Sequence, residues 1–316
     1  MRPIERAASR EQLRERNMDE RGTEEKLVGI IGLGIMGGAI STNLVQRGWS
    51  VIGYDIDEAR RHEAAEAGVT VVESASQVAA HSRTIMTSLP TPAAAQIVAQ
   101  TIAHGSSPHT VVELSTFALD DKLAFKSILD ASNHVALDCP LSGTGAQAKM
   151  RDLVVYASGD STAIKRCELL FADFAKQSVD LGAYGNGSRM KFVANLLVAI
   201  HNVAAAEAMM VAESAGLDLR QVIECVGAGA GGSRMFQMRA PMMAKGTYAP
   251  ATMRVATWKK DMAIIDRFVN ELGCAVPLFA ATVPFYEKAL AMGFADQDTA
   301  SVFEVFKSPS STGVRP

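Results

Sequence analysis

The sequence has few of the features that mark secreted or metal-binding proteins. Only four of its 316 residues are cysteines, and no two of them form a Cys-x-x-Cys pair. Cysteines spaced this widely are typical of free thiols in a reducing compartment, and their spacing offers no set of zinc ligands. We therefore expect neither a disulfide framework nor a metal site.

A strong excess of either charge is also missing. The formal net charge is −3, the isoelectric point is near 6.1, and aromatic residues make up only 6% of the chain. No stretch interleaves basic and aromatic residues, so nothing indicates a surface that attracts nucleic acid. The sequence predicts a protein that does not bind nucleic acid.

Residues 1–26 contain few apolar residues but carry seven basic and seven acidic side chains. A segment of this composition buries too little apolar surface to fold alone, so we expect a disordered or loosely helical extension. It has no apolar run typical of a signal peptide, and its acidic residues are not typical of a transit peptide. We therefore expect a cytoplasmic protein.

The most informative feature is a glycine-rich turn that follows the apolar run Leu27–Ile31. It consists of Gly32, Leu33, Gly34, Ile35, Met36 and Gly37. In a dinucleotide-binding turn, the first glycine permits a tight bend, the second lets backbone amides approach a pyrophosphate, and the third lets the next helix pack closely. A helical stretch follows, so the pattern predicts a phosphate site at a helix N-terminus.

A second predicted strand, Trp49–Tyr54, ends at Asp55, which comes 23 residues after Gly32. An acidic side chain there accepts hydrogen bonds from the adenosine ribose and repels a 2′-phosphate, so it favours NAD over NADP. Arg60 and Arg61 follow one turn later and keep NADP possible. Leu27–Gln46 has no charged residue and is long enough to cross a bilayer, but its five glycines fit a soluble β-α-β unit better and we expect no membrane span.

Short apolar runs alternate with helical stretches up to about Gly182 and predict a doubly wound parallel sheet. The further expected strands are Thr70–Val72, Arg83–Ser88, Thr110–Leu114, Val135–Asp138 and Leu153–Ser158. After Gly187 the pattern changes to long helical segments, expected at about Ser188–Ala215, Leu217–Val226, Val255–Leu272, Pro277–Met292 and Thr299–Phe306. We therefore expect an α/β protein with a Rossmann-type NAD-binding domain at 27–186 and an all-helical domain for substrate binding and oligomerisation at 187–316.

Polar loops follow several of the predicted strands, at the sheet edge where ligands of such folds bind. These loops are Leu89-Pro90-Thr91, Ser115-Thr116 and Ser142-Gly143-Thr144. A simpler interpretation makes Ser115 or Thr116 the N-cap of the next helix, and Ser142-Gly143 a bare turn.

Lys191 and Asn195 lie four residues apart in a predicted helix and therefore share one face, among apolar neighbours. A lysine in such surroundings is costly unless it has a role. The alternatives are a lysine whose charge reaches out to solvent and an ion pair between the two domains.

Together, these residues resemble the β-hydroxyacid dehydrogenase family from Leu27 to about Val305. The matching motifs also include Asp138 to Gly143, Lys260-Asp261-Met262 and Gly293 to Asp298. The resemblance implies that Lys191 is the catalytic lysine and Asn195 its partner. It implies that Ser142 and Gly143, with Thr144 beside them, bind the substrate carboxylate. It also implies that Leu89 and Pro90 contact the cofactor, and that Thr116 and Lys260 contact the cofactor or the substrate.

Two positions depart from the family pattern. Thr144 stands where the family often has glycine, and Ala94 stands where it has asparagine, whereas Lys191 is intact, unlike the corresponding position in imine reductases. The resemblance implies hydride transfer between NAD and a small 3-hydroxy acid or its semialdehyde, of the 3-hydroxyisobutyrate or 2-hydroxy-3-oxopropionate type, with Lys191 as general acid/base. Alternatives are a 6-phosphogluconate-type oxidative decarboxylase and a non-catalytic NAD-binding scaffold. The long apolar helices favour a homodimer or homotetramer.

Overall fold

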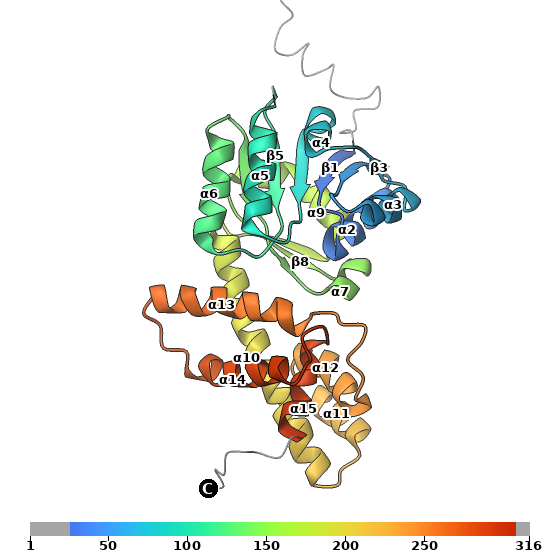
Figure 1. Cartoon of the computed structure of the whole chain (residues 1–316), viewed down its shortest axis with the longest axis vertical. Coiled ribbons are helices and arrows are strands. Elements are labelled where there is room, and N and C mark those ends of the chain that lie inside the picture. The colour runs from blue at the N-terminus through green and yellow to red at the C-terminus, as the bar shows by residue number, and fades with distance from the viewer. Residues whose placement is uncertain (1–25, 106, 308–316) are drawn as a thin grey trace, which may run out of the picture.

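The computed structural model describes residues 26–105 and 107–307, so the expectation for the charged extension, apart from Lys26, lies outside the described residues. Figure 1 shows a sheet-containing region built from the first half of the chain and a helical region built from the second. A long helix, α10 (Asn186–Ser214), starts against the sheet region and runs through the helical region.

The sheet region is built on six parallel strands in the order β3-β2-β1-β4-β5-β6. They are β1 (Leu27–Ile31), β2 (Ser50–Tyr54), β3 (Thr70–Val71), β4 (Thr84–Thr87), β5 (Thr110–Glu113) and β6 (Val135–Asp138). The strand order reverses between β1 and β4, and the carboxyl ends of strands at such a reversal form the ligand site of doubly wound sheets. The predicted α/β class and parallel sheet are confirmed.

Helices cover both faces of this sheet, as they must because each face is apolar. One core cluster includes Ile40, Leu44 and Phe171, and the other includes Ile102, Phe125 and Leu129. The helices of the region are α2 (Ile35–Gln46), α3 (Glu58–Glu66), α4 (Ala75–His81), α5 (Pro92–Ala103), α6 (Leu119–Asp130), α7 (Gly145–Lys149), α8 (Ser161–Arg166) and α9 (Glu168–Phe174).

The prediction that Leu153–Ser158 continues the parallel sheet is wrong. This segment, β8 (Val154–Ala157), lies in a separate three-stranded sheet, antiparallel to β7 (Leu141–Ser142) and parallel to β9 (Gln177–Asp180). A single bridge between Asp138 and Ser158 connects it to β6. β7 was missed because it is two residues long, and β9 because most of its residues are polar and exposed, so neither has an apolar pattern.

The second half of the chain is helical, as predicted. After α10 come α11 (Leu219–Ala228), α12 (Arg234–Lys245), α13 (Val255–Glu271), α14 (Pro277–Ala291), η1 (Thr299–Ser301) and α15 (Val302–Lys307). Sequence reasoning missed α12, since Pro241 and a glycine-rich start make the segment look like a loop. The hydrophobic core of the helical region includes Met209, Trp258 and Phe279.

Among the described residues, only α10 is long and apolar enough to cross a membrane by length and composition. Several of its polar side chains are buried inside the fold, however. Asn202 Nδ2 donates to the Tyr286 hydroxyl and to the Thr299 carbonyl, each at 3.0 Å. Helix α10 is therefore the central core helix of the helical region.

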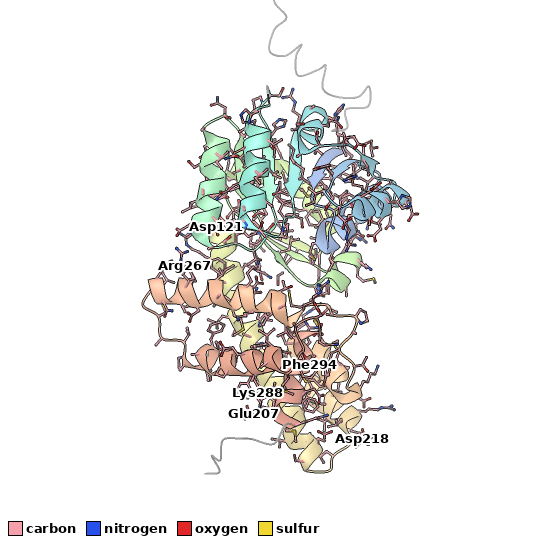
Figure 2. All side chains as sticks on the ribbon, in the orientation of Figure 1. Asp121, Glu207, Asp218, Arg267, Lys288 and Phe294 are labelled. Carbon is pink, nitrogen blue, oxygen red and sulfur yellow. The ribbon has the colours of Figure 1, made fainter. Side chains whose placement is uncertain are left out.

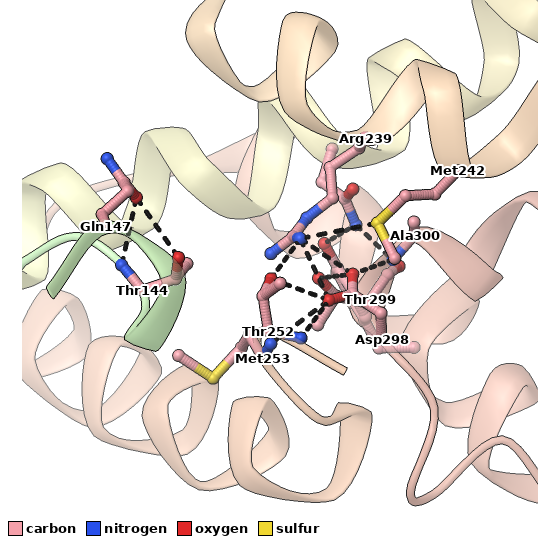
Figure 3. Close-up of polar contacts among 11 residues, drawn as sticks. Thr144, Gln147, Arg239, Met242, Thr252, Met253, Asp298, Thr299 and Ala300 are labelled. Atoms are coloured by element: carbon pink, nitrogen blue, oxygen red, sulfur yellow. Dashed lines mark hydrogen bonds and ion pairs between the residues drawn. The ribbon is translucent and has the colours of Figure 1, made fainter. Parts of the chain in front are cut away.

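A buried ion pair connects separate segments of this region. Asp298, fully buried, lies 3.0 Å from Arg239 Nη1 and accepts hydrogen bonds from Thr252 N at 2.8 Å and Ala300 N at 3.0 Å (Figure 3). The carboxylate thus fastens the segment before α13 to α12 and η1. Removing one partner of such a pair leaves a buried, uncompensated charge.

We predict that Asp298→Ala lowers the free energy of unfolding by about 3–5 kcal/mol, because Arg239 is left without its counter-charge. Asp296→Ala is the matched control, since its side chain is 87% exposed and lies 3.7 Å from Arg254; its loss is expected to stay below about 1 kcal/mol. Urea denaturation measures both, and equal losses for the two variants would contradict the assigned role.

Candidate active site

The glycine-rich turn has the geometry that a pyrophosphate needs. Gly32 has φ +94°, and its amide donates to the Tyr54 carbonyl at 2.9 Å, so the chain bends sharply at the end of β1. Helix α2 starts with Gly34 as its N-cap, and no side chain caps it. A Cβ added at Gly34 would meet nothing within 4 Å. The amides of the first turn therefore face open space, which fits the phosphates of a dinucleotide.

Of the other residues in the turn, some have side chains in the hydrophobic core and others have side chains at the site. Leu33 is buried in the core, while the Ile35 side chain is 57% exposed. Ile35 also contacts the loop after β7, since a Cβ added at Gly145 would lie 2.4 Å from its Cγ2. The nucleotide turn and the loop that carries Ser142 to Thr144 are therefore neighbours.

Asp55 lies beside the glycine turn, as its spacing predicts. Its Oδ2 accepts from Leu33 N at 2.7 Å and its Oδ1 from Asp57 N at 2.9 Å. Arg61 folds back to the same strand end, and its Nη1 donates to the Asp55 carbonyl at 2.7 Å. Arg60 pairs with Glu63 instead. One anionic and one cationic side chain thus border the place where an adenosine ribose would lie.

The loops after β4 and β5 are joined to each other. Ser115 Oγ accepts a hydrogen bond from Leu89 N at 2.9 Å, which fixes the Leu89-Pro90 loop against the end of β5. The N-cap of α6 is Ala118, so the interpretation of Ser115 or Thr116 as a helix cap is wrong. The Thr116 carbonyl accepts from Lys260 Nζ at 2.8 Å, which brings α13 to this loop.

The segment from Ser142 to Thr144 offers donors for a ligand. Gly143 has φ +133°, and Thr144 is the N-cap residue of α7, with its amide donating to Gln147 Oε1 at 3.0 Å (Figure 3). The Thr144 hydroxyl lies 3.4 Å from the same oxygen. Within the described chain, the half-buried Ser142 hydroxyl has no hydrogen-bond partner, so it is available to a bound molecule.

Lys191 and Asn195 project from one face of α10, as predicted, and both are buried. Lys191 is 8% exposed and Asn195 is 4% exposed. The Asn195 side-chain amide donates to Asp261 Oδ2 at 3.3 Å. Among the described residues the Lys191 amine has neither a hydrogen bond nor an ion pair. It therefore neither reaches out to solvent nor forms an ion pair between the two regions.

The environment of Lys191 changes its proton affinity. Burial lowers the pKa of its amine to about 8; the negative charge of Asp261 opposes this shift, and the positive charge of Lys260 adds to it. An amine with a pKa close to neutrality is populated in both protonation states under ordinary conditions, as a proton-transfer catalyst needs to be.

Sequence reasoning named Lys260 but missed Asp261 as a site residue. Asp261 is 5% exposed and lies 3.1 Å from Lys260 Nζ through its Oδ1, while its Oδ2 holds Asn195. The signal was present: Asp261 falls on the face of α13 that also buries Trp258 and Ile265. A carboxylate on a buried helix face needs a partner, and that partner is in the site.

Side chains from the helical region reach the sheet region around the site. Arg267 of α13 pairs with Asp120 at the start of α6, where Figure 2 labels the neighbouring Asp121. Arg234 at the start of α12 pairs with Asp152, which in turn accepts from Gln147 at 3.3 Å. Among the described residues, no group of His, Cys, Asp and Glu is arranged to hold a metal ion.

Comparison with protein-family models covers most of the chain. Residues 27–184 match the NAD binding domain of 6-phosphogluconate dehydrogenase. Residues 185–306 match the model for NADP-dependent 3-hydroxyisobutyrate dehydrogenase. The two matches meet where α10 begins.

Individual relatives agree with the family models. The chain is 28% identical over 287 residues to glyoxylate/succinic semialdehyde reductase 1 of Arabidopsis thaliana, covering 89% of this chain and 98% of that one. It is 28% identical to L-threonate dehydrogenase of Cupriavidus necator, covering 88% and 95%. The solved 3-hydroxyisobutyrate dehydrogenase of Mycobacterium tuberculosis with L-serine superimposes with a TM-score of 0.80 at 25% identity, covering 90% and 99%.

The glycine turn, the buried lysine and these matches lead to one conclusion. The chain belongs to the β-hydroxyacid dehydrogenase family and is an NAD(P)-dependent oxidoreductase that acts on a hydroxyl-bearing carbon.

Proposed function

We propose that this enzyme interconverts a small 3-hydroxy acid and its semialdehyde, of the 3-hydroxyisobutyrate or 2-hydroxy-3-oxopropionate type, with Lys191 as the general acid/base. The observation that carries the proposal is the buried Lys191 amine, which has no partner among the described residues and whose pKa is lowered to about 8. Such a group is suited to exchanging a proton with a substrate oxygen.

Each site residue then has a distinct task. The nicotinamide, when bound, exchanges a hydride with the substrate carbon. Lys191 donates a proton to the carbonyl oxygen in reduction and removes it from the hydroxyl in oxidation. Asn195 is oriented by its hydrogen bond to Asp261, which leaves its carbonyl oxygen free to face the substrate. Ser142 supplies a hydroxyl and Gly143 a backbone amide to the substrate carboxylate.

The Ser142–Thr144 segment also bears on how large a substrate can bind. Thr144 places a β-branched side chain beside the carboxylate position, where the family often has glycine, so the pocket is narrower there. The relatives are named for glyoxylate, succinic semialdehyde, L-threonate and 3-hydroxyisobutyrate, all of them small. This supports a short carboxylate as the substrate.

We also propose a preference for NAD over NADP, because the Asp55 carboxylate borders the ribose position and repels a 2′-phosphate. Arg61 at the same strand end keeps binding of NADP possible. A cytoplasmic location and a homodimer or homotetramer complete the proposal. Three apolar residues on one stripe of α10, Met190, Val193 and Leu197, are 40–54% exposed and support association.

We predict that Lys191→Ala lowers kcat by ~10²–10⁴-fold while nucleotide binding persists, because only the proton carrier is removed. Lys259→Ala, an exposed lysine on α13, serves as the control and is expected to retain full activity. The assay follows nucleotide absorbance with 3-hydroxyisobutyrate, glycerate, 4-hydroxybutyrate, L-threonate and 6-phosphogluconate. Turnover of 6-phosphogluconate alone would replace the proposal with oxidative decarboxylation, and nucleotide binding without turnover of any acid would favour a scaffold.

The pH dependence has opposite signs in the two directions. Oxidation needs the neutral amine, so kcat/KM is expected to rise with pH and level off above about 8, the pKa of Lys191. Reduction needs the protonated amine, so kcat/KM is expected to fall above the same pH. Rate profiles in both directions measure this, and profiles that are flat between pH 7 and 9 would exclude Lys191 as the proton carrier.

Substitution of Asp55, which follows β2, and of Arg61, which lies in α3, is expected to change cofactor preference in opposite directions. Asp55→Ala removes a ribose acceptor and a negative charge, so the ratio of kcat/KM with NAD to that with NADP should fall by about 10-fold or more. Arg61→Ala removes the nearby positive charge and should raise this ratio. Steady-state kinetics with both nucleotides provides the comparison, and a change of the same sign in both variants would refute the assigned roles.

A further inference from the structure

A charged cluster lies buried beneath the site and takes no part in the reaction described above. It consists of Glu113 at the end of β5, Lys122 in α6 and Asp138 at the end of β6, all 0% exposed. Lys122 Nζ forms ion pairs with Glu113 Oε2 and, at 3.0 Å, with Asp138 Oδ1. One cation therefore joins two strand ends inside the protein.

Such a cluster is stable only if its members are fully bonded, because removal of each charge from water is costly. Burial by itself lowers the pKa of Lys122, but the negative charges of Asp138 and Glu113 outweigh it and hold the pKa above its ordinary value. The amine therefore stays protonated. A buried apolar side chain would fill the same space without the cost of removing a charge from water. Space filling alone therefore does not explain why residue 122 is a lysine.

One end of the cluster leads to the loops around the nucleotide site. Glu113 Oε1 accepts a hydrogen bond from Ser115 N at 2.8 Å, and Ser115 Oγ accepts one from Leu89 N at 2.9 Å. The two loops that follow β4 and β5 are thus held to Glu113 through consecutive hydrogen bonds.

The other end leads to the helix that carries Lys191. Asp138 accepts from Ser188 N at 2.8 Å and from Ser188 Oγ at 2.9 Å. The helix start approaches closely here, since a Cβ added at Gly187 would lie 2.3 Å from the Tyr156 carbonyl. Ser188 stands three residues before Lys191, less than one helical turn away.

We infer that Lys122 is a positioning residue, which holds the first turn of α10 at a set distance from the Leu89 and Ser115 loops and thereby sets the place of the Lys191 amine. Lys122 touches neither substrate nor nucleotide and acts only through Glu113 and Asp138. The catalytic consequence rests on the proposed function, whereas the effect on the surroundings of Lys191 does not.

Ser188→Ala is the decisive variant, because it removes one bond to Asp138 at the α10 end and leaves every charge in the cluster paired. A loosened first turn admits water to Lys191, so the pKa of its amine should rise toward the ordinary lysine value. The kcat should fall by about 10-fold, since small displacements of a reacting group reduce the rate. The KM for the nucleotide should stay within about 2-fold, because the Glu113 side is untouched.

Ser82→Ala is the matched control. Ser82 is a buried serine of the same region, 4% exposed, and its hydroxyl bonds the Val78 carbonyl at 2.7 Å, away from the cluster. Lys122→Met removes the cation itself and should lower kcat by about 100-fold in protein that folds. If Lys122→Met does not fold, Ser188→Ala still decides the question.

The pKa of Lys191 is measured on the full chain by acetylation with acetic anhydride at a series of pH values, followed by peptide mass spectrometry. This needs no substrate, so it separates the two hypotheses. If no hydroxy acid is turned over, the proposed function fails and the labelling still tests the positioning. If Ser188→Ala leaves the Lys191 pKa and kcat equal to those of Ser82→Ala, the positioning role is refuted while the function stands.

Discussion

The constraint on which the site depends is the exclusion of water from a single amine. Lys191 lies in α10, which packs against α13, and its amine is buried with the charges of Asp261 and Lys260 nearby. An isolated helix would leave the same side chain fully hydrated, with an ordinary pKa and little use as an acid or base at neutral pH. The chemistry of the residue is therefore a property of the packing between helices.

The two sides of the site differ in how they are held. On the sheet side, the bonds Leu33 N to Asp55 and Leu89 N to Ser115 lie within the sheet region, and the buried Asp138 pairs there with Lys122. On the helical side, the contacts to the sheet region include ion pairs of half-exposed side chains, such as Arg234 and Arg267. Exposed pairs contribute little free energy. The start of α10 is different, because its Ser188 forms buried hydrogen bonds to Asp138. The helical region is thus held firmly at α10 and less firmly at these exposed pairs.

Local patterns in the sequence were enough for much of the fold and part of the site. The glycine spacing, the alternation of strands and helices, and the four-residue spacing of Lys191 and Asn195 depend on residues close in sequence. What was missed has no such pattern. β7 has only two residues, β9 is mostly polar, and Leu153–Ser158 looks the same whether its neighbour is parallel or antiparallel. Ser115 looked like a helix cap because its partner, Leu89 N, comes from another strand end.

The sequence by itself determined that a nucleotide turn, a parallel sheet and a helix with a lysine among apolar residues are present, since backbone geometry and side-chain periodicity act over a few residues. Only the tertiary structure decided that Asp261 holds Asn195, that Lys122 joins Glu113 to Asp138, and that the pKa of Lys191 falls to about 8. Burial and electrostatic interactions depend on distances between segments far apart in the chain, and those distances exist only once the chain has folded.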